Sequence, residues 1–246
     1  MTISGDRTRI VDTILTANIP DWITHEQAKQ SLDHITRAAA CDLGGLQEFG
    51  PGRDDLLDRL QRRQNYGWER ADGGPPIIYD RGRYGVLKVR RKVLARAGFV
   101  GRLPGRRSTL PDSVATLVIL ADDLLAEDVV LINAHLTAEV QRGKSYRTDL
   151  AHRLRVTRHQ RETRTLGRIA RRHKRKGRRV YLTADTNYDG WTVRGFVSCW
   201  DRRDGGTLGN RAVDVIAAPE RAGTVQTIKP PHGDHKAVVA TYRRKP

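Results

Sequence analysis

The sequence predicts a single domain of the mixed α/β class, formed by residues 1–246. The chain is long enough, and with 38% hydrophobic residues apolar enough, to bury one large core. Segments with strand-like and helix-like periodicity alternate along it, and no internal repeat or low-complexity linker interrupts them. We therefore expect strands and helices to share one core.

The N-terminal part opens with a β–α–β pattern. Residues 13–17 are predicted to form a strand, and residues 26–40 have helical spacing. The stretch DLGGLQE at 42–48 is predicted to be a buried strand that ends in an acidic residue. A second short helix is expected at 54–63.

The middle of the chain is predicted to form a β-meander, with strand candidates separated by Gly, Pro and Asp at 75–80, 84–89, 113–120 and 127–136. A long helix is then expected at 148–176, where apolar residues form a thin stripe on an otherwise Arg-rich surface. Further strand candidates follow this helix at 179–187, 195–200, 211–218 and 235–242.

Positive charge is the strongest feature of the composition. The chain has 45 Lys and Arg residues against 28 Asp and Glu residues, which gives a net charge of +17 and a pI near 10.6. Sixteen of the basic residues lie in 142–179, together with only two acids. Such a segment attracts polyanions, although a solvated basic surface is the alternative reading. If the polyanion is nucleic acid, the expected phosphate contacts are Arg142, Lys144, Arg147, Arg155 and Arg158.

Several classes of protein are disfavoured. No run of 18 or more apolar residues predicts a membrane span, and the polar start MTISGDRTRI lacks the apolar segment of a secretory signal. The two cysteines, Cys41 and Cys199, provide neither a disulfide framework nor a zinc knuckle. We expect a cytoplasmic protein that acts as a monomer and has no membrane partner.

Polar residues recur at the ends of the predicted strands. In open sheets, strand ends are the places where binding and catalytic sites form. Each such residue alone would also fit ordinary turn chemistry or a structural histidine, so it is the ordered set that points to a site. The set is Asn18, Glu48, His135, Asp185, Asn187, Asp214, Asp234 and His235.

In order along the chain, TANIP, GLQEF, INAHL, ADTNYDG, RAVDVIAA and GDHKAV resemble the motifs of the endonuclease/exonuclease/phosphatase superfamily, the family of DNase I and exonuclease III. The resemblance covers almost the whole chain. It implies a four-layered α/β sandwich of the α+β type, with two mostly antiparallel β-sheets face to face, helices outside and a divalent metal in a cleft at one rim. Four positions depart from the family pattern without removing a group that the mechanism needs: Ala134, Ala184, Thr186 and Gly233.

The resemblance implies a metal-dependent hydrolase of phosphate esters, and the residues present suit that chemistry. Hydrolysis needs a cation that neutralises charge, an activated water and a stabilised leaving oxygen. Glu48 is expected to be a ligand of Mg²⁺, for which Mn²⁺ can substitute, and Asn18 and Asp234 are expected to support the metal site.

The same resemblance implies catalytic roles for the remaining polar residues. Asp185 is expected to orient and deprotonate the attacking water, and Asn187 to hydrogen-bond the phosphate from the same face of the strand. His235, oriented by Asp214, is expected to donate to a phosphoryl oxygen, and His135 to stabilise developing charge from the other side.

The predicted function is that of a nuclease, a divalent-metal-dependent phosphodiesterase that hydrolyses DNA or RNA through an activated water. Nucleic acid is favoured because the basic segment offers many phosphate contacts, whereas a small phosphate ester needs only a local pocket. Two alternatives stay open: a phosphatase or phosphodiesterase acting on a small or lipid phosphate ester, and a nucleic-acid-binding protein that has lost catalysis. Abasic-site specificity is disfavoured, because Phe49 and Gly50 follow LQE where the abasic-site enzymes of the family have Thr or Cys and then Lys.

Overall fold

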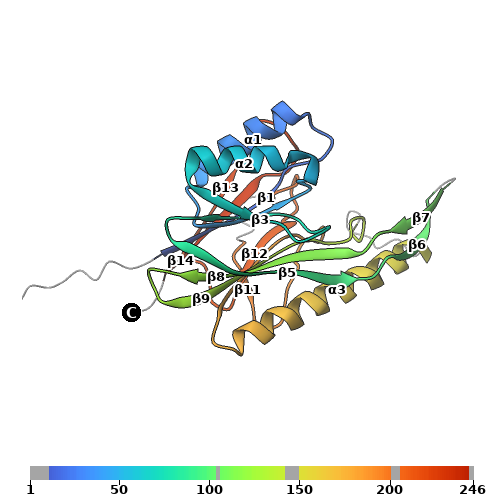
Figure 1. Cartoon of the computed structure of the whole chain (residues 1–246). Coiled ribbons are helices and arrows are strands. Elements are labelled where there is room, and N and C mark those ends of the chain that lie inside the picture. The colour runs from blue at the N-terminus through green and yellow to red at the C-terminus, as the bar shows by residue number, and fades with distance from the viewer. Residues whose placement is uncertain (1–10, 104–105, 142–149, 201–205, 244–246) are drawn as a thin grey trace, which may run out of the picture.

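Two six-stranded β-sheets pack face to face in the computed structural model, and helices cover their outer faces (Figure 1). The structure describes residues 11–103, 106–141, 150–200 and 206–243. The layers run from α1 (His25–Ala39) and α2 (Asp54–Gln64), through sheet A and sheet B, to α3 (Leu150–Lys174). The fold is the four-layered sandwich, with two mostly antiparallel sheets, that the sequence predicts.

The two sheets have related topologies, and a separate hairpin lies beside them. From edge to edge, sheet A contains β13 (Thr224–Ile228), β14 (Ala237–Arg243), β1 (Val11–Asn18), β2 (Leu43–Gln47), β4 (Ile77–Asp80) and β3 (Tyr66–Glu69). Sheet B contains β11 (Val197–Ser198), β12 (Asp214–Ala218), β10 (Arg179–Asp185), β9 (Glu127–His135), β8 (Ser113–Asp122) and β5 (Tyr84–Ala95). The hairpin consists of β6 (Gly98–Leu103) and β7 (Arg106–Leu110).

Each sheet contains one parallel pair of strands among antiparallel ones. β1 pairs in parallel with β2, and β9 with β10, and the chain between the two strands of each pair forms α1 or α3. Because the two strands of a parallel pair end at the same edge, their carboxyl ends deliver side chains to one rim of the sandwich. This arrangement positions the candidate site.

The sequence explains where α1 begins and which face it buries. The Thr24 hydroxyl accepts a hydrogen bond from the Gln27 backbone N–H at 3.2 Å, and the Gln27 side chain accepts one from the Thr24 N–H at 3.0 Å. Ala40 ends the helix in the left-handed conformation. The apolar face packs on sheet A through Ala28, Leu32, Ile35 and Ala39.

Three apolar layers fill the spaces between these elements. One lies between sheet A and the helices α1 and α2, one between the two sheets, and one between sheet B and α3. The strands β8 and β9 are buried on both faces, which explains why their sequences are continuous apolar runs without alternation.

The predicted helices and central strands are present, whereas the sequence does not predict β3, β13 or the β6–β7 hairpin. β3 and β13 are the two edge strands of sheet A, and the hairpin lies outside both sheets. The candidate at 195–200 contributes only the two-residue strand β11. In the ranges that the structure describes, every helix is too short or too polar to cross a membrane.

Candidate active site

Four strands deliver polar side chains to one rim of the sandwich. In sheet A, Asn18 is the last residue of β1 and Glu48 follows β2. In sheet B, His135 and Asp185 end β9 and β10, and the parallel register pairs them directly. The site therefore lies where the two sheets meet.

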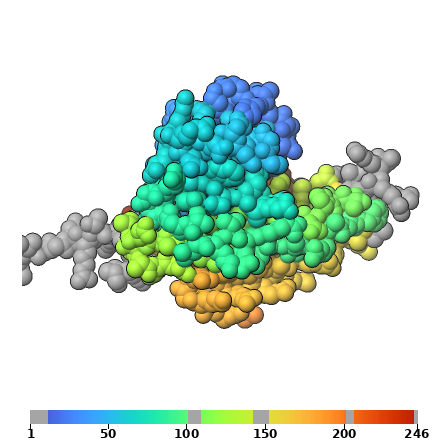
Figure 2. All heavy atoms as spheres, in the orientation of Figure 1, coloured from blue at the N-terminus to red at the C-terminus, as the bar shows by residue number. Residues whose placement is uncertain are grey.

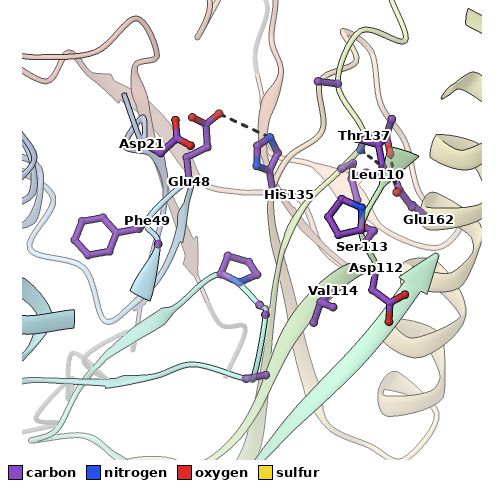
Figure 3. Close-up of a pocket in the computed structure, with 18 of the residues that line it drawn as sticks. Asp21, Glu48, Phe49, Leu110, Asp112, Ser113, Val114, His135, Thr137 and Glu162 are labelled. Carbon is purple, nitrogen blue, oxygen red and sulfur yellow. Dashed lines mark hydrogen bonds and ion pairs between the residues drawn. The ribbon is translucent and has the colours of Figure 1, made fainter. Parts of the chain in front are cut away.

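Asn18 joins the two sheets at this rim. Its amide nitrogen Nδ2 donates to Glu48 Oε1 at 3.0 Å and to Asp185 Oδ2 at 2.8 Å. His135 Nε2 lies 3.6 Å from Asp185 Oδ2 and 3.9 Å from Glu48 Oε1, and Figure 3 shows the imidazole turned toward Glu48. Glu48, His135 and Asp185 thus have ligand atoms within 4.8 Å of one another.

Asp185 is almost fully buried, with 1% of its surface exposed. Burial raises the pKa of its carboxyl group and the neighbouring Asp214 raises it further, whereas the charges of His135 and His235 lower it. The backbone N–H of Asn187 donates to Asp185 Oδ1 at 2.9 Å and fixes the orientation of the carboxylate. The resulting carboxylate is more basic than that of an ordinary aspartate, as a general base requires.

A second buried pair lies beside Asp185. Asp214, the first residue of β12, is directly opposite Asp185 in the antiparallel register. His235 Nδ1 lies 2.7 Å from Asp214 Oδ2, and both side chains are buried. Burial alone would lower the pKa of His235, but the hydrogen bond and charge of Asp214 outweigh it and raise this pKa to about 9. Asp214 therefore fixes the imidazole and favours its protonated form.

Two site residues have backbone conformations that residues other than Gly rarely adopt. Glu48 has a φ of 54° and Asn187 a φ of 51°, both in the left-handed region. Sparsely populated conformations of this kind gather at functional sites. The prediction that Asn187 shares a strand face with Asp185 is wrong, because β10 ends at Asp185. Asn187 lies in the following turn, where its Nδ2 donates to Leu136 O at 3.0 Å.

Asp234 does not join the other predicted metal ligands. Its side chain is exposed, whereas that of His235 is buried. Asp234 lies in the bend at 231–234, and the β-bridge to Leu208 begins only at His235, so the two neighbouring side chains have different environments. Among the described residues, two groups of three could hold a metal ion, and neither includes Asp234: Glu48 with His135 and Asp185, and Asp185 with Asp214 and His235.

The first of these groups fits a divalent cation that prefers oxygen ligands. Glu48 supplies a carboxylate oxygen, and a carboxylate oxygen of Asp185 lies within 4.8 Å of it. The Asn18 side-chain oxygen Oδ1 is buried without a hydrogen-bond partner in the described part of the chain. A buried carbonyl oxygen without a partner costs free energy unless a ligand takes it up. The donor set therefore suits Mg²⁺ or Mn²⁺, and the partly exposed Glu48 keeps the position open to solvent.

Glu162 supports the loop after His135, a role that the predictions from the sequence do not include. Glu162 is fully buried in α3, and it accepts hydrogen bonds from the Thr137 N–H at 2.8 Å and from the Thr137 hydroxyl at 2.7 Å. Arg158 Nε lies 3.2 Å from the same carboxylate. The sequence does contain a signal for this buried pair, since Glu162 is an isolated acid four positions after Arg158 in a basic helix.

The predicted nucleic-acid contacts divide into two sets. Arg142, Lys144 and Arg147 lie outside the described residues. Arg155 and Arg158 are described, but their side chains are buried and do not form an open basic surface.

The contacts of these two arginines are internal to the fold. The Arg158 guanidinium donates to the backbone oxygens of Arg96 and Pro111, in addition to its contacts with Glu162 and Thr137. Arg155 Nη1 lies 3.8 Å from Glu139 and 3.4 Å from Ala138 O. Both positive charges therefore hold α3 in place, which corrects the expectation that their guanidinium groups are directed at phosphate.

A cleft of about 800 Å³ opens beside Glu48 and His135 (Figure 3). It extends from this rim toward α3, and its far wall includes Arg158 and Glu162. The remaining wall comes from the loop between β3 and β4 and from the residues around the start of β8. A substrate bound at Glu48 has room to continue in this direction.

Local packing explains two departures from the family pattern. Thr186 is fully buried, and its hydroxyl donates to Val213 O at 2.7 Å. Gly233 has a φ of 102°, and a Cβ at this position would lie 3.1 Å from Pro20 Cδ. A serine there would be strained, so the glycine suits this backbone.

Several solved structures share the architecture of this chain. The chain is similar to D. rerio TDP2 complexed with a single-strand DNA product, with a TM-score of 0.64 and 16% identity, covering 94% of this chain and 98% of that chain. It is similar to the human Nocturnin catalytic domain, with a TM-score of 0.64 and 13% identity over 96% of this chain and 98% of that one. It is also similar to a mannosyl-6-phosphatase from Bacteroides thetaiotaomicron, with a TM-score of 0.66 and 11% identity over 93% and 98%.

The likeness to these structures confirms the fold that the sequence motifs imply. The chain has the fold of the endonuclease/exonuclease/phosphatase superfamily. No family model and no curated protein sequence matches the chain.

Proposed function

We propose that the protein is a divalent-metal-dependent phosphodiesterase that hydrolyses the backbone of DNA or RNA. The observation that carries this proposal is the Asn18 amide group, which holds Glu48 and Asp185 together across the two sheets. Next to Asp185, His135 and His235 supply two imidazoles. This combination of carboxylates, an amide and imidazoles suits metal-assisted hydrolysis of a phosphate ester.

Glu48 and Asn18 are the proposed metal-holding residues. Asn18 donates Nδ2 to Glu48, which leaves the unpartnered Asn18 Oδ1 for the cation. A divalent cation bound there would neutralise negative charge on the phosphate group during attack.

Asp185 is the proposed general base. Its raised pKa makes it a better proton acceptor than an exposed aspartate. Each of its oxygens accepts a hydrogen bond, Oδ2 from Asn18 and Oδ1 from the Asn187 N–H, so the carboxylate is fixed in one orientation. A fixed carboxylate removes the proton from a water molecule at a defined position, which favours attack along one direction.

His235 is proposed to donate to a phosphoryl oxygen. Asp214 holds its Nδ1, so Nε2 is the ring nitrogen left for the substrate. Because its pKa is raised to about 9, the imidazole is protonated at neutral pH and stabilises negative charge. His135 is proposed to act in the same way from the end of β9, and Asn187 to contact the phosphate from the turn after β10.

Nucleic acid is the proposed substrate for three reasons. The net charge of +17 attracts polyanions. The cleft continues from Glu48 toward α3 and does not close around a single phosphate. The structurally similar D. rerio TDP2 is described in complex with a single-strand DNA product.

The test is incubation of purified protein with plasmid DNA, linear DNA, RNA and a sugar phosphate, each with Mg²⁺, with Mn²⁺ and with EDTA. We expect cleavage of nucleic acid with either metal and none with EDTA. Asp185→Asn, purified in the same way, is the control for a contaminating nuclease. Release of inorganic phosphate from the sugar phosphate, without cleavage of nucleic acid, would identify a phosphatase.

A further inference from the structure

The two outer faces of the sandwich differ in charge. On sheet A, α1 and α2 together carry five acidic residues and five Lys or Arg residues, and pairs such as Glu26 with Lys29 neutralise some of them. On sheet B, α3 carries nine Lys or Arg residues and a single acid, Glu162, which is buried against Arg158. A basic composition spread evenly over the surface would not produce this difference, so the charge is concentrated on one side.

A row of cations on β5 lies beside α3. β5 is an edge strand of sheet B, and the register with β8 shows which of its side chains point outward. Lys88, Arg90 and Lys92 pair with residues that belong to the core layer between sheet B and α3, namely Ile119, Leu117 and Ala115. Because directly paired residues of neighbouring strands point to the same face, these three cations lie on the outer face.

A second row of cations follows α3. Arg168, Arg172 and Lys176 are exposed and recur every four residues, about one helical turn, with Lys176 in the turn after the helix. β5 (green) and α3 (gold) lie beside each other in Figures 1 and 2. Burial lowers the pKa of Lys92, and the charges of Arg90 and Arg172 lower it further, which shows that the two rows are close.

These six cations, here called the basic face, have no acidic partner in the part of the chain that the structure describes. In the described ranges, no carboxylate forms an ion pair with Lys88, Arg90, Lys92, Arg168, Arg172 or Lys176, while neighbouring arginines do pair with acids, as Arg91 does with Asp112 and Arg178 with Asp128. Like charges held close together repel one another, and an anionic partner removes that repulsion.

The basic face begins where the cleft ends. Arg158 lines the cleft and donates to the backbone oxygen of Arg96, the residue immediately after β5. From this point β5 leads away from the cleft to Lys88 over roughly 27 Å at the rise of a strand. The helix leads away to Lys176 over roughly 27 Å at the rise of an α-helix. A linear polyanion leaving the cleft would run along both rows.

We propose that the basic face is a second binding surface for nucleic acid, which holds the phosphate backbone of a long substrate beyond the cleft. The proposal rests on the function proposed above for the identity of the substrate. Alternate residues on a strand are about 6.8 Å apart, which equals the rise between every second phosphate along one strand of duplex DNA. Because the basic face continues from the cleft, a linear chain of phosphates fits it better as a partner than the flat surface of an anionic membrane does.

The test compares two variants that each remove three positive charges. The first, K88Q/R90Q/K92Q, alters the basic face. The matched control, R37Q/R62Q/R63Q, alters exposed arginines of α1 and α2. Binding to a 30-base-pair duplex and to a single strand of equal length is measured in EDTA over a range of salt concentrations, so that no hydrolysis is needed for the readout.

The first variant should bind nucleic acid about tenfold more weakly at moderate salt. For the duplex, the slope of log K against log salt concentration should become shallower by roughly 0.9 for each phosphate contact that is lost. The control should keep the affinity and slope of the unaltered protein. Hydrolysis of a four-nucleotide substrate, too short to reach the basic face, should be unchanged in both variants. If K88Q/R90Q/K92Q does not fold, R168Q/R172Q/K176Q tests the same surface from α3.

Equal nucleic-acid affinity of the folded face variant and the control would overturn the proposal. Tighter binding of the unaltered protein to vesicles of anionic lipid than to either nucleic acid, lost in the face variant, would overturn it in favour of a membrane surface. Absence of hydrolysis on every substrate would overturn the proposed function instead, and the binding measurements in EDTA would still decide whether the basic face holds nucleic acid.

Discussion

His235 Nδ1 lies 2.7 Å from Asp214 Oδ2, and both side chains are buried. The other Asp214 oxygen, Oδ1, has no hydrogen-bond partner in the described part of the chain. The imidazole is therefore the group that compensates the cost of burying the Asp214 carboxylate. Removing the imidazole leaves a buried charge unpaired, whereas neutralising Asp214 leaves an uncharged imidazole that a buried site tolerates.

The pH dependence of activity should follow the titration of the His235 imidazole. We expect kcat/KM to fall as the pH rises through about 9, because the imidazole then loses the proton that, in the proposed mechanism, it directs at the phosphate. In Asp214→Asn the falling limb should move toward the ordinary histidine pKa of about 6.5. Profiles of kcat/KM against pH for both proteins check this, and a limb that does not move would assign the titration to another group.

The same pair should also make stability depend on pH. The pKa of His235 in the folded state, about 9, is higher than the unfolded value of about 6.5. The stabilisation from protonated His235 is thus complete below about pH 6.5 and is lost as the pH rises through about 9. Urea unfolding should show a larger loss of free energy for Asp214→Asn at pH 6 than at pH 10. Equal losses at both pH values would contradict the assignment.

Three substitutions should separate catalysis from binding. Asp185→Asn and His235→Ala are each expected to lower single-turnover cleavage by about 10²–10⁴-fold, and Asp214→Asn by less, because Asp214 acts through the imidazole. Substrate affinity should survive all three. The double variant Asp214→Asn/His235→Ala should be scarcely slower than His235→Ala alone, since residues that act as a unit are not additive. Fully additive losses would show that Asp214 and His235 act independently.

Glu48→Gln should weaken the use of metal without unfolding the protein. A neutral amide is a poorer ligand for a hard cation, so the Mg²⁺ concentration for half-maximal cleavage should rise severalfold. The melting temperature should change little, because the Glu48 side chain is partly exposed. Asp21→Asn is the matched control, because Asp21 also lines the cleft and lies beside Glu48 in Figure 3. Undiminished activity of the unaltered protein in EDTA, or undiminished activity of Glu48→Gln, would rule out this role.

Gly45→Ala should disturb the packing beneath the site. A Cβ at Gly45 would lie 2.1 Å from Thr183 Oγ1 and 2.5 Å from Asn133 Oδ1, both on the facing sheet. We expect a loss of about 1–3 kcal/mol in unfolding free energy, together with lower activity, because the sheets must separate near the site. Gly52→Ala, where a Cβ meets nothing within 4 Å, is the control. Equal stability of the two variants by urea titration would contradict the packing argument.

The sequence predicts the convergence of the central site residues because few strands are involved and their ends are clearly marked. Asn18, Glu48, His135 and Asp185 each end or follow a buried strand of a parallel pair, so their meeting follows from topology. The orientation of Asp234 is harder to predict from the sequence, because it depends on the conformation of the bend at 231–234.

Long-range contacts account for the features that the sequence does not predict. The Arg158 guanidinium donates to the backbone oxygens of Pro111 and Arg96, which lie 47 and 62 positions away in the sequence. The sequence of a basic helix does not reveal such distant partners. β13 is an edge strand whose side chains are mostly exposed or half-buried, so its alternation is weak. The direction of the Asn187 side chain depends on the residue at which β10 ends. Strand ends are the least certain part of a sequence-based assignment.

The hydrogen bond between Asn18 and Asp185 spans 167 positions of the chain. Contacts between residues so distant form late in folding, because the long intervening segment must first be closed. His235 and the strand β14, which pairs with β1, come later still in the sequence. A chain that is still emerging from the ribosome and lacks β14 therefore has no assembled candidate site. With the activity proposed here, the nascent protein cannot cut the messenger RNA that encodes it before His235 and β14 have been synthesised.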